Sequence, residues 1–347
     1  MKLFVFPGNI EEDILAIGAK QLPYMRTDFF SQIVKESEAM LLKLIGCPSG
    51  RAIIYTGSGT GAMDAIVTNY VSTKKKVLVI AGGSFGYRWR DLCTYYNTPY
   101  ILYEIEFGKD IDYLDLEATI AREKPDVLLC QHHETSSGQL FNMKKIGDLC
   151  RENKVSLVVD AISSFLADSF KMDEYGVDIC VTSSQKGLNI LPGLAIIALA
   201  PKLLNYDFAQ RGFYFDFKEN LKNLTRGQTP YSPATSLFLQ MHERLIRVTS
   251  LGVDQVIGQV AQKATFFRQL CAKYKWPHLA ETPSNCITGF FLYKNGDLLF
   301  KKLMEKGFTI MPGGTPNYFR VSHLGVQSNQ DLEALAQAIY SIEQLKP

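Results

Sequence analysis

The chain has 347 residues, of which 46% are apolar and 21% charged, a composition typical of a folded globular protein and not of a disordered or fibrous one. The 37 basic and 35 acidic residues leave a formal net charge of +2, so no strong field favours nucleic acid or an acidic membrane surface. The length exceeds what one hydrophobic core usually fills, which predicts one large and one small domain.

Neither the N-terminus nor the cysteines indicate export or a membrane. The opening segment MKLFVFPGNI is interrupted at Pro7 and Gly8, too early for a signal peptide. No run approaches the roughly 18 apolar residues that cross a bilayer. The seven cysteines are scattered and lack C-x-x-C spacing. These features predict a cytoplasmic protein with reduced thiols.

The first part of the chain alternates between strand-like and helical segments. Continuous Val, Ile and Leu runs indicate strands that are buried on both faces. Their alternation with helices predicts a mostly parallel sheet wrapped by helices, in a large α/β domain of residues 20–250. The predicted strand segments are RAIIYT, KKVLVIAGG, PDVLLCQHHE, VSLVVDAISS, VDICVTSSQKGL and GLAIIALA.

The pattern changes after the last of these strands. Residues 202–235 are polar, aromatic and punctuated by glycine and proline, as is typical of loops that wall an active site. A long amphipathic helix is predicted from Ser236 towards Tyr274. The tail then alternates between short strands and helices, which predicts a small α+β domain of residues 251–347, joined by the N-terminal segment 1–19.

The segment YTGSGTGAMDA follows the first predicted strand and suits a phosphate. The spacing of Gly57 and Gly59 fits the dinucleotide fingerprint G-x-G-x-x-[G/A]. That fingerprint also needs a carboxylate at the end of the next strand, and KVLVIAGGSFG ends without one. A glycine turn into a helix still offers free N–H groups, a positive dipole and the hydroxyls of Ser58 and Thr60, which suit a single phosphate monoester. A tight turn without a ligand is the alternative.

Two charged residues near the ends of later strands indicate which cofactor carries that phosphate. The strand VSLVVD ends on Asp160, where a carboxylate is costly to bury without a cationic partner. Lys186 follows the next strand, and a lysine in a dry pocket can form a Schiff base. Taken singly, Asp160 also suits a helix N-cap and Lys186 a surface position. The order phosphate turn, aspartate, lysine is the one expected for pyridoxal phosphate (PLP), whose pyridine nitrogen needs an acidic partner.

These segments resemble the class V aminotransferases of PLP fold type I, among them alanine–glyoxylate, serine–pyruvate and 2-aminoethylphosphonate–pyruvate transaminases. The resemblance covers nearly the whole chain and is most specific in DAISSF and DICVTSSQKGLNILPGLAIIAL. It implies a PLP-dependent transferase fold and a homodimer with shared active sites. It also implies transfer of an amino group from a small-molecule amino donor to a small 2-oxo acid, pyruvate or glyoxylate.

The resemblance implies roles for individual residues at the cofactor ring. Lys186 would be the Schiff-base lysine, and Asp160 would pair with the pyridinium. The segment GGSFGYRW matches the one whose aromatic residue stacks on the ring, which points to Phe85. The segment HHETSSG matches the one whose hydroxyl binds the phenolic oxygen, which points to Thr135, with Ser136 as the alternative.

Phosphate contacts would come from two subunits. The segment RGQTPYSPATS matches the one that reaches the neighbouring subunit's phosphate, with Thr229 in the matching place. Arg226 stands where relatives often have tyrosine, and it would bind the phosphate more strongly or meet an acidic substrate. Within one subunit, the residues that would bind the phosphate are Ser58, Gly59, Thr60 and Gln185.

Arg320, in the segment YFRVSHLG, matches the arginine that binds the substrate carboxylate. Strand alternation places Arg320 and Ser322 on one face, and an inward-facing arginine needs an anion. A structural ion pair with an acidic residue is the alternative. The segments FVFPGNI and LPYMRTDFF depart from the family pattern near the substrate pocket, so the substrate is less defined than the cofactor.

Other functions need features that this sequence offers only in part. A PLP-dependent lyase such as a cysteine desulfurase needs a mobile cysteine, and Cys271 and Cys286 lie outside any obvious Gly/Ser-rich loop. A non-catalytic PLP-binding regulator usually carries a DNA-binding module, for which the chain has no spare length. His132, His133 and Glu134 raise the question of a metal, but adjacent strand residues face opposite ways and H-E-x-x-H spacing is absent, so no metal is predicted.

Overall fold

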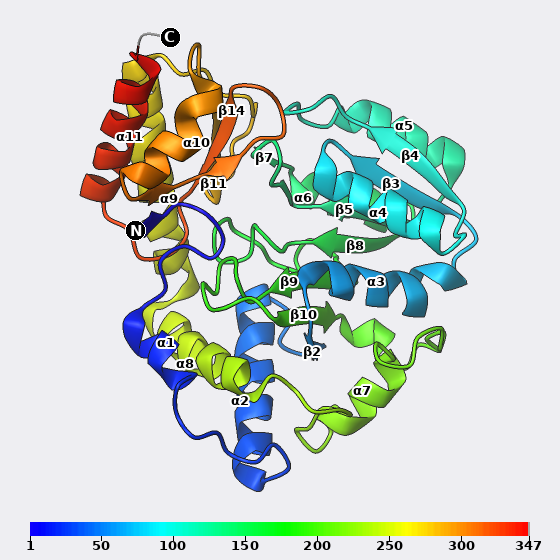
Figure 1. Ribbon diagram of the computed structural model, residues 1–347. Helices are drawn as coiled ribbons and strands as arrows, with labels where there is room; N and C mark the ends of the chain where they lie inside the picture. The colour runs from blue at the N-terminus through cyan, green and yellow to red at the C-terminus, as the bar shows by residue number, and fades with distance from the viewer. Residues whose placement is uncertain (346–347) are drawn as a thin grey trace.

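The computed structural model describes residues 1–345 (Figure 1). Its centre is a seven-stranded sheet in the order β2-β10-β9-β8-β5-β3-β4. Strand β10 is antiparallel to both of its neighbours, and every other pair in this sheet is parallel. The predicted mostly parallel α/β architecture is therefore confirmed. The strands are β2 (Arg51–Thr56), β3 (Val77–Ala81), β4 (Tyr100–Glu104), β5 (Val127–Gln131), β8 (Ser156–Asp160), β9 (Ile179–Ser183) and β10 (Leu194–Leu199).

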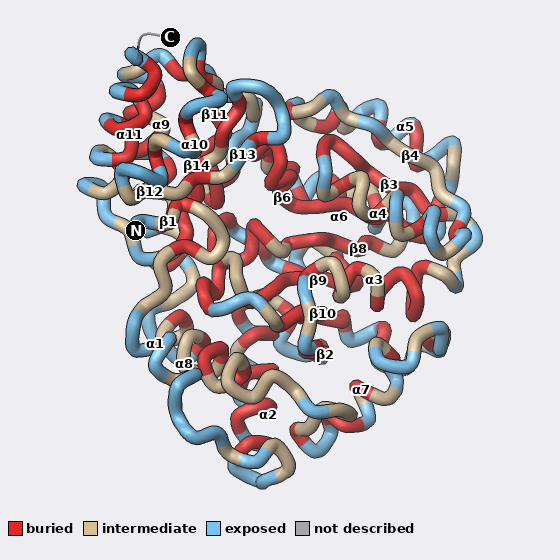
Figure 2. The backbone as a smooth tube through the Cα atoms, viewed as in Figure 1, coloured by how far each residue is buried: buried red, intermediate tan, exposed pale blue. Residues whose placement is uncertain are grey.

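Burial explains why these runs form strands. Every residue of β3, β5, β9 and β10 is buried, because helices cover the sheet on both faces (Figure 2). Helix α3 packs beside α4, and α5 packs beside α6 (Figure 1). The helices of this large body are α1 (Glu12–Ile17), α2 (Asp28–Ile45), α3 (Gly59–Asn69), α4 (Ser84–Tyr95), α5 (Tyr113–Glu123), α6 (Met143–Glu152), α7 (Phe217–Leu224) and α8 (Thr235–Leu251), with short 3-10 turns at Val71–Thr73 and Pro201–Leu203.

Two helical expectations were wrong. The single helix expected from Ser236 towards Tyr274 is divided into α8 and α9 (Val253–Tyr274) by Gly252, whose φ of +93° is a left-handed value that favours glycine. The helical spacing of apolar residues continues before and after Gly252, so this spacing alone does not predict where one helix ends and the next begins. Helix α7 lies inside the stretch expected to be loop, where Asp216 caps it by accepting a hydrogen bond from the backbone N–H of Glu219.

A second core lies at the C-terminal end of the chain. Strands β11, β14 and β13 form a three-stranded antiparallel sheet, and Phe267, Trp276 and Phe290 are buried beside it. Strand β1 pairs in parallel with β12, whereas Ile14 of α1 packs into the large core, so the N-terminal segment divides between the two cores. The elements of this smaller body are β1 (Lys2–Leu3), α9, β11 (Ile287–Phe291), α10 (Gly296–Glu305), β12 (Phe308–Thr309), β13 (Met311–Pro312), β14 (Tyr318–Ser322) and α11 (Asn329–Glu343).

The carboxyl ends of β3, β5, β8 and β9 share one edge of the large sheet, which is where open α/β sheets bind their ligands. A short hairpin of β6 (His133–Glu134) and β7 (Gln139–Leu140) follows β5 at this edge. Within residues 1–345, no helix combines the length and the apolar character needed to cross a membrane.

Candidate active site

Lys186 lies on the turn that joins β9 to β10, just past the carboxyl end of β9. Burial lowers the pKa of Lys186 to about 8. Its Nζ lies 3.6 Å from the centroid of the Phe6 ring, a contact that sequence reasoning missed. The side chain of Asn189 fixes the N-terminal segment there, because it accepts from the N–H of Gly8 and donates to the carbonyl of Asn9, each at 3.0 Å. An amine with a lowered pKa is the nucleophile that Schiff-base formation requires.

Asp160 ends β8 and is only 4% exposed. Its Oδ1 accepts a hydrogen bond from the N–H of Ile162 at 2.8 Å. Burial raises the pKa of Asp160 to about 7, since the charged form is poorly solvated and Glu134 adds a second negative charge nearby. A cationic partner such as a pyridinium would restore ionisation, so the position suits the predicted role.

The phosphate turn lies beside the segment that follows Asp160. Ser58 caps α3, accepting from the N–H of Gly61 at 3.4 Å, and leaves the first turn of the helix open to an anion. A Cβ atom at Gly59 would lie 2.5 Å from Cδ1 of Ile162, so a larger residue there would force the Ile162 side chain to shift. The fold thus brings the predicted phosphate turn and the predicted pyridinium partner together.

Arg88 is a residue of this site that sequence reasoning missed. Its Nη1 donates to Oγ1 of Thr60 at 3.0 Å, and its guanidinium lies 4.8 Å from the centroid of the Phe85 ring. The spacing of the two residues in the sequence could have predicted this contact. Residues three apart on a helix lie on the same side, so Arg88 lies one turn after Phe85. Arg88 therefore joins the predicted stacking ring to the phosphate turn.

Glu134, considered above only as a metal ligand, anchors this part of the site. Its buried carboxylate accepts from the backbone N–H groups of Phe85 and Gly86 at the start of α4. The same carboxylate accepts from the backbone N–H of Ser136 at 3.1 Å and from its hydroxyl at 2.5 Å. The hydroxyl of Ser136 is thus bound to a carboxylate, and the choice between Thr135 and Ser136 as the cofactor's hydroxyl contact stays a prediction.

A chain of hydrogen bonds runs behind Thr135. Its hydroxyl donates to Oγ of Ser163 at 2.6 Å, and that oxygen lies 2.8 Å from Nδ1 of His133. Burial holds the pKa of His133 well below its usual value, so the imidazole is neutral. Its Nε2 has no hydrogen-bond partner in the part of the chain that the structure describes. The two predicted cofactor segments, after β5 and after β8, are therefore connected through Ser163.

Arg320 extends from β14 of the small body towards this site. Its Nη1 donates to the carbonyl of Thr135 at 2.7 Å, while Nε and Nη2 donate to the carbonyl of Pro312 at 3.1 and 2.6 Å. Burial lowers the pKa of Arg320. Its hydrogen bonds within residues 1–345 go to backbone carbonyls and to no carboxylate, which does not support the alternative of a structural ion pair.

Arg226 and Thr229 lie apart from these residues. Arg226 is exposed, and its Nη2 donates to Oδ1 of Asn223 at 2.6 Å. The hydroxyl of Thr229 donates to the carbonyl of Tyr231 at 2.7 Å, while its own carbonyl accepts from Arg26 at 2.5 Å. None of these contacts reaches the Lys186 turn of the same chain, so the role of both residues at a neighbouring subunit's phosphate stays a prediction.

The two cysteines considered for lyase chemistry are both fully buried. Burial raises the thiol pKa of Cys271 and of Cys286. Both side chains belong to hydrophobic clusters of the smaller body and its boundary. Neither provides the exposed thiolate on a mobile segment that a desulfurase needs.

The donors gathered at the sheet edge fit PLP, and no group of three or more His, Cys, Asp or Glu side chains within residues 1–345 is arranged to hold a metal ion. Fold and site together define a PLP-dependent enzyme of fold type I. The sequence profile of the family described as "Aminotransferase class-V" matches residues 22–220, more than half of the chain. The chain belongs to this family and is an aminotransferase, as the resemblance implied.

Individual relatives match the chain over most of their length, although their names differ. The chain is 29% identical to a serine–glyoxylate aminotransferase from Hyphomicrobium methylovorum, over 92% of this chain and 84% of the relative. It is 28% identical to a protein named "Soluble hydrogenase, small subunit" from a Synechococcus species, over 97% of this chain and 91% of the relative. Its fold is similar to that of an aspartate aminotransferase from Thermus thermophilus, with a TM-score of 0.92, 23% identity and 99% of each chain covered.

Proposed function

We propose that this aminotransferase moves an amino group from an amino donor to a small 2-oxo acid, glyoxylate or pyruvate. The observation that carries the proposal is Arg320, a half-buried cation that extends from the small body to Thr135 and has only carbonyl partners within residues 1–345. Its planar fork matches a carboxylate with two parallel hydrogen bonds. The Phe6 ring at Nζ of Lys186 limits the room there, which favours small substrates.

The names of several relatives support a small acceptor, because serine–glyoxylate and L-aspartate–glyoxylate aminotransferases are among them. The hydrogenase name of the Synechococcus relative is not transferred to this chain, since the described residues offer no grouped metal ligands.

Three charged residues of the site, Asp160, Lys186 and Arg320, have tasks in this reaction. PLP, when bound, supplies an electron sink for the negative charge that develops at the substrate's Cα. Asp160 holds the proton on the pyridine nitrogen, which keeps that sink effective. The amine of Lys186 would hold the cofactor, and the same amine would move the proton at the substrate's Cα, a transfer that its lowered pKa favours. Arg320 orients the substrate carboxylate so that this proton faces Lys186.

The lysine assignment is tested on the purified protein. PLP bound to Lys186 gives visible absorption, which Lys186→Ala should abolish while the exposed control Lys294→Ala leaves it unchanged. Borohydride reduction followed by peptide mapping should place the label on Lys186, and a label on another lysine would overturn the assignment. A screen of amino donors against glyoxylate and pyruvate then identifies the substrates; transfer to neither acceptor would refute the proposed function.

We also propose that the working unit is a cytoplasmic homodimer in which Arg226 and Thr229 serve the partner's phosphate. Arg226 is exposed, and within residues 1–345 its hydrogen bond goes to Asn223 and not to the Lys186 turn, which supports this arrangement. Mixing inactive Lys186→Ala subunits with Thr229→Ala/Arg226→Ala subunits should restore activity, because one site of each mixed dimer is then intact. A fully active, PLP-saturated monomer in sedimentation would exclude the arrangement.

A further inference from the structure

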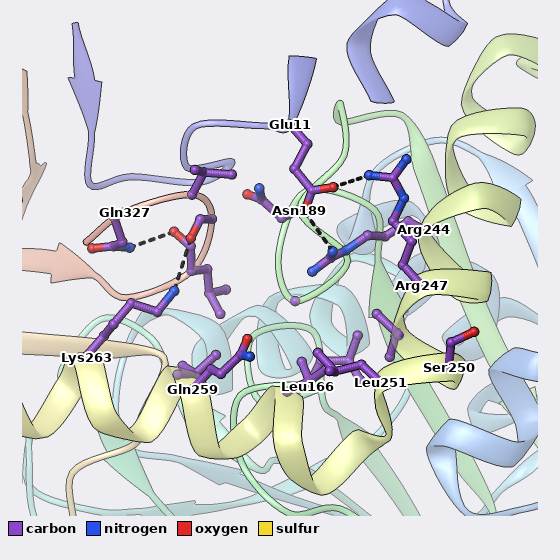
Figure 3. Close-up of a pocket in the computed structure, with 17 residues that line it drawn as sticks. Glu11, Leu166, Asn189, Arg244, Arg247, Ser250, Leu251, Gln259, Lys263 and Gln327 are labelled. Carbon is purple, nitrogen blue, oxygen red and sulfur yellow. Dashed lines mark hydrogen bonds and ion pairs between the residues drawn. The ribbon is translucent and has the colours of Figure 1, made fainter. Parts of the chain in front are cut away.

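A cavity of about 670 Å³ lies against the turn that carries Lys186, outside the set of residues assigned to the reaction (Figure 3). Gly187 and Asn189 of that turn form one wall, and the junction of α8 and α9 forms another. The segment from Leu324 to Gln327, which follows β14, closes it from the small body. The volume lies within the range of small-molecule sites.

Two of the three cations that line the cavity already have anionic partners. Glu11 accepts from Nη1 of Arg244 at 3.2 Å and also from Arg247. Arg247 binds two more carboxylates, those of Asp13 and Glu243, which do not line the cavity. The arginines therefore belong to a paired network on one side of the cavity, where Figure 3 shows Glu11 between them.

Lys263 is the third cation, and it has no such partner. Its side chain extends from α9 into the cavity (Figure 3), where Nζ donates to the carbonyl of Gly325 at 3.1 Å. No carboxylate lies within ion-pair distance of this ammonium among the residues described. An ammonium carries three donors, so two remain for a ligand. Burial lowers the pKa of Lys263 to about 8, with Arg244 as a second positive charge nearby, so an anion beside this amine would favour its charged form.

The rest of the wall is mixed: valine and leucine side chains line it beside the polar side chains of Asn189, Ser250, Gln259 and Gln327. Side chains of valine and leucine come from α8, from α9 and from the segment after β14. A bare inorganic anion would leave this surface in contact with water only, whereas an apolar chain would cover it. The apolar residues used in this argument are Leu251, Val256, Val260, Leu324 and Val326.

We propose that this cavity is a second binding site, for an organic monocarboxylate with an apolar body, whose carboxylate pairs with Nζ of Lys263. The one unpaired cation favours a ligand with a single negative charge, and the apolar side chains of the wall favour a ligand with an apolar chain. The ligand would contact the segments that follow Lys186 and Arg320, one from each body of the protein. The site is separate from the reaction, so its occupancy can be measured whether or not the protein transfers amino groups.

Isothermal titration of the PLP-saturated protein with hexanoate tests the proposal, with hexylamine and inorganic phosphate as comparison ligands. Hexanoate is expected to bind at least tenfold more tightly than either. Lys263→Met keeps the apolar stem and removes the charge, and it should weaken hexanoate binding about tenfold to a hundredfold, the worth of a charged hydrogen bond. Lys273→Met, at an exposed position in the last turn of the same helix, should leave the affinity unchanged.

Two further variants separate this site from its alternatives. Arg320→Ala should retain the Lys263-dependent binding, which excludes hexanoate bound at the substrate position. Gln259→Glu places a carboxylate on the exposed rim of the cavity and should also weaken hexanoate, which keeps the test valid if Lys263→Met does not fold. Hexanoate affinity that is unchanged in Lys263→Met, or in Gln259→Glu if Lys263→Met does not fold, would overturn the proposal, as would equal affinity for hexylamine or phosphate. Failed transamination with intact hexanoate binding would count against the proposed function alone.

Discussion

Replacing Glu134 by glutamine keeps the shape of a fully buried side chain and removes its charge. Both carboxylate oxygens of Glu134 act only as acceptors: Oε1 faces Ser136, and Oε2 faces Gly86 and Nε2 of Gln131. A glutamine at position 134 must turn its NH2 group either towards the donors of Ser136 or towards those of Gly86 and Gln131. Turning it towards Gln131 costs less, because the Oε1 of Gln131 has no hydrogen-bond partner among the described residues and the Gln131 amide can rotate to accept from the new NH2 group.

That rearrangement still leaves the N–H of Gly86 without an acceptor. A buried donor without a partner costs about 1–3 kcal/mol. Loss of the negative charge at the N-terminus of α4 adds about 0.5–2 kcal/mol, since the carboxylate interacts with the helix dipole there. Glu134→Gln should therefore destabilise the protein by about 2–4 kcal/mol. The start of α4 carries Phe85, so PLP should also bind several-fold more weakly.

Thermal unfolding of the apo-protein and titration with PLP measure the two effects. Glu117→Gln is the matched control, because Glu117 is exposed on α5. The Glu134 variant should unfold several degrees below the control and require more PLP for saturation. An unfolding midpoint within one degree of the control, with an unchanged PLP affinity, would refute the reasoning that this carboxylate holds α4 and the cofactor ring in place.

Three other outcomes are expected. Burial raises the folded pKa of Asp160 to about 7 from an unfolded value near 3.9, so the contribution of Asp160 to the stability of the apo-protein should fall as the pH rises through this interval, and thermal scans should show Asp160→Asn gaining stability relative to the unmutated protein with rising pH; a constant difference between the two would contradict this. Arg320→Ala should lower kcat/KM for amino acids by about tenfold to a hundredfold while amines without a carboxylate and PLP absorption change little; an equal loss for both donor types would make Arg320 structural. Arg88→Leu should weaken PLP binding about tenfold in titrations, whereas Arg90→Leu, which removes an ion pair with Asp91 and a contact with the Tyr87 ring, should not; equal effects would remove Arg88 from the site.

The central strands were predictable because their physical cause is local. A strand buried on both faces is mostly apolar, so β3, β5, β9 and β10 are visible in the sequence. Strand β4, Tyr100–Glu104, lies at the sheet edge and is only half-buried, and it gave no such signal. The order of glycine turn, aspartate and lysine was informative because parallel strands bring their carboxyl ends to one edge.

The contacts that complete the site were not predictable in the same way. Phe6 reaches Lys186 from 180 residues away in the chain, through the smaller body's N-terminal strand and the two hydrogen bonds of Asn189. Glu134 was visible as an acidic residue next to two histidines, but its partners at the start of α4 are set by tertiary packing. Only the contact between Arg88 and the Phe85 ring followed from local helical spacing.

The antiparallel strand β10 has a consequence for how the enzyme acquires its cofactor. It lies between β9, its neighbour in the chain, and β2, which was synthesised about 140 residues earlier. The turn that carries Lys186 leads into β10, which is paired on both edges only when this long-range pairing has formed, and such pairings form late because closing the loop costs entropy. Capture of PLP during refolding would then report completion of the sheet, and the visible absorption of the bound cofactor would rise with the last folding phase and not with the first.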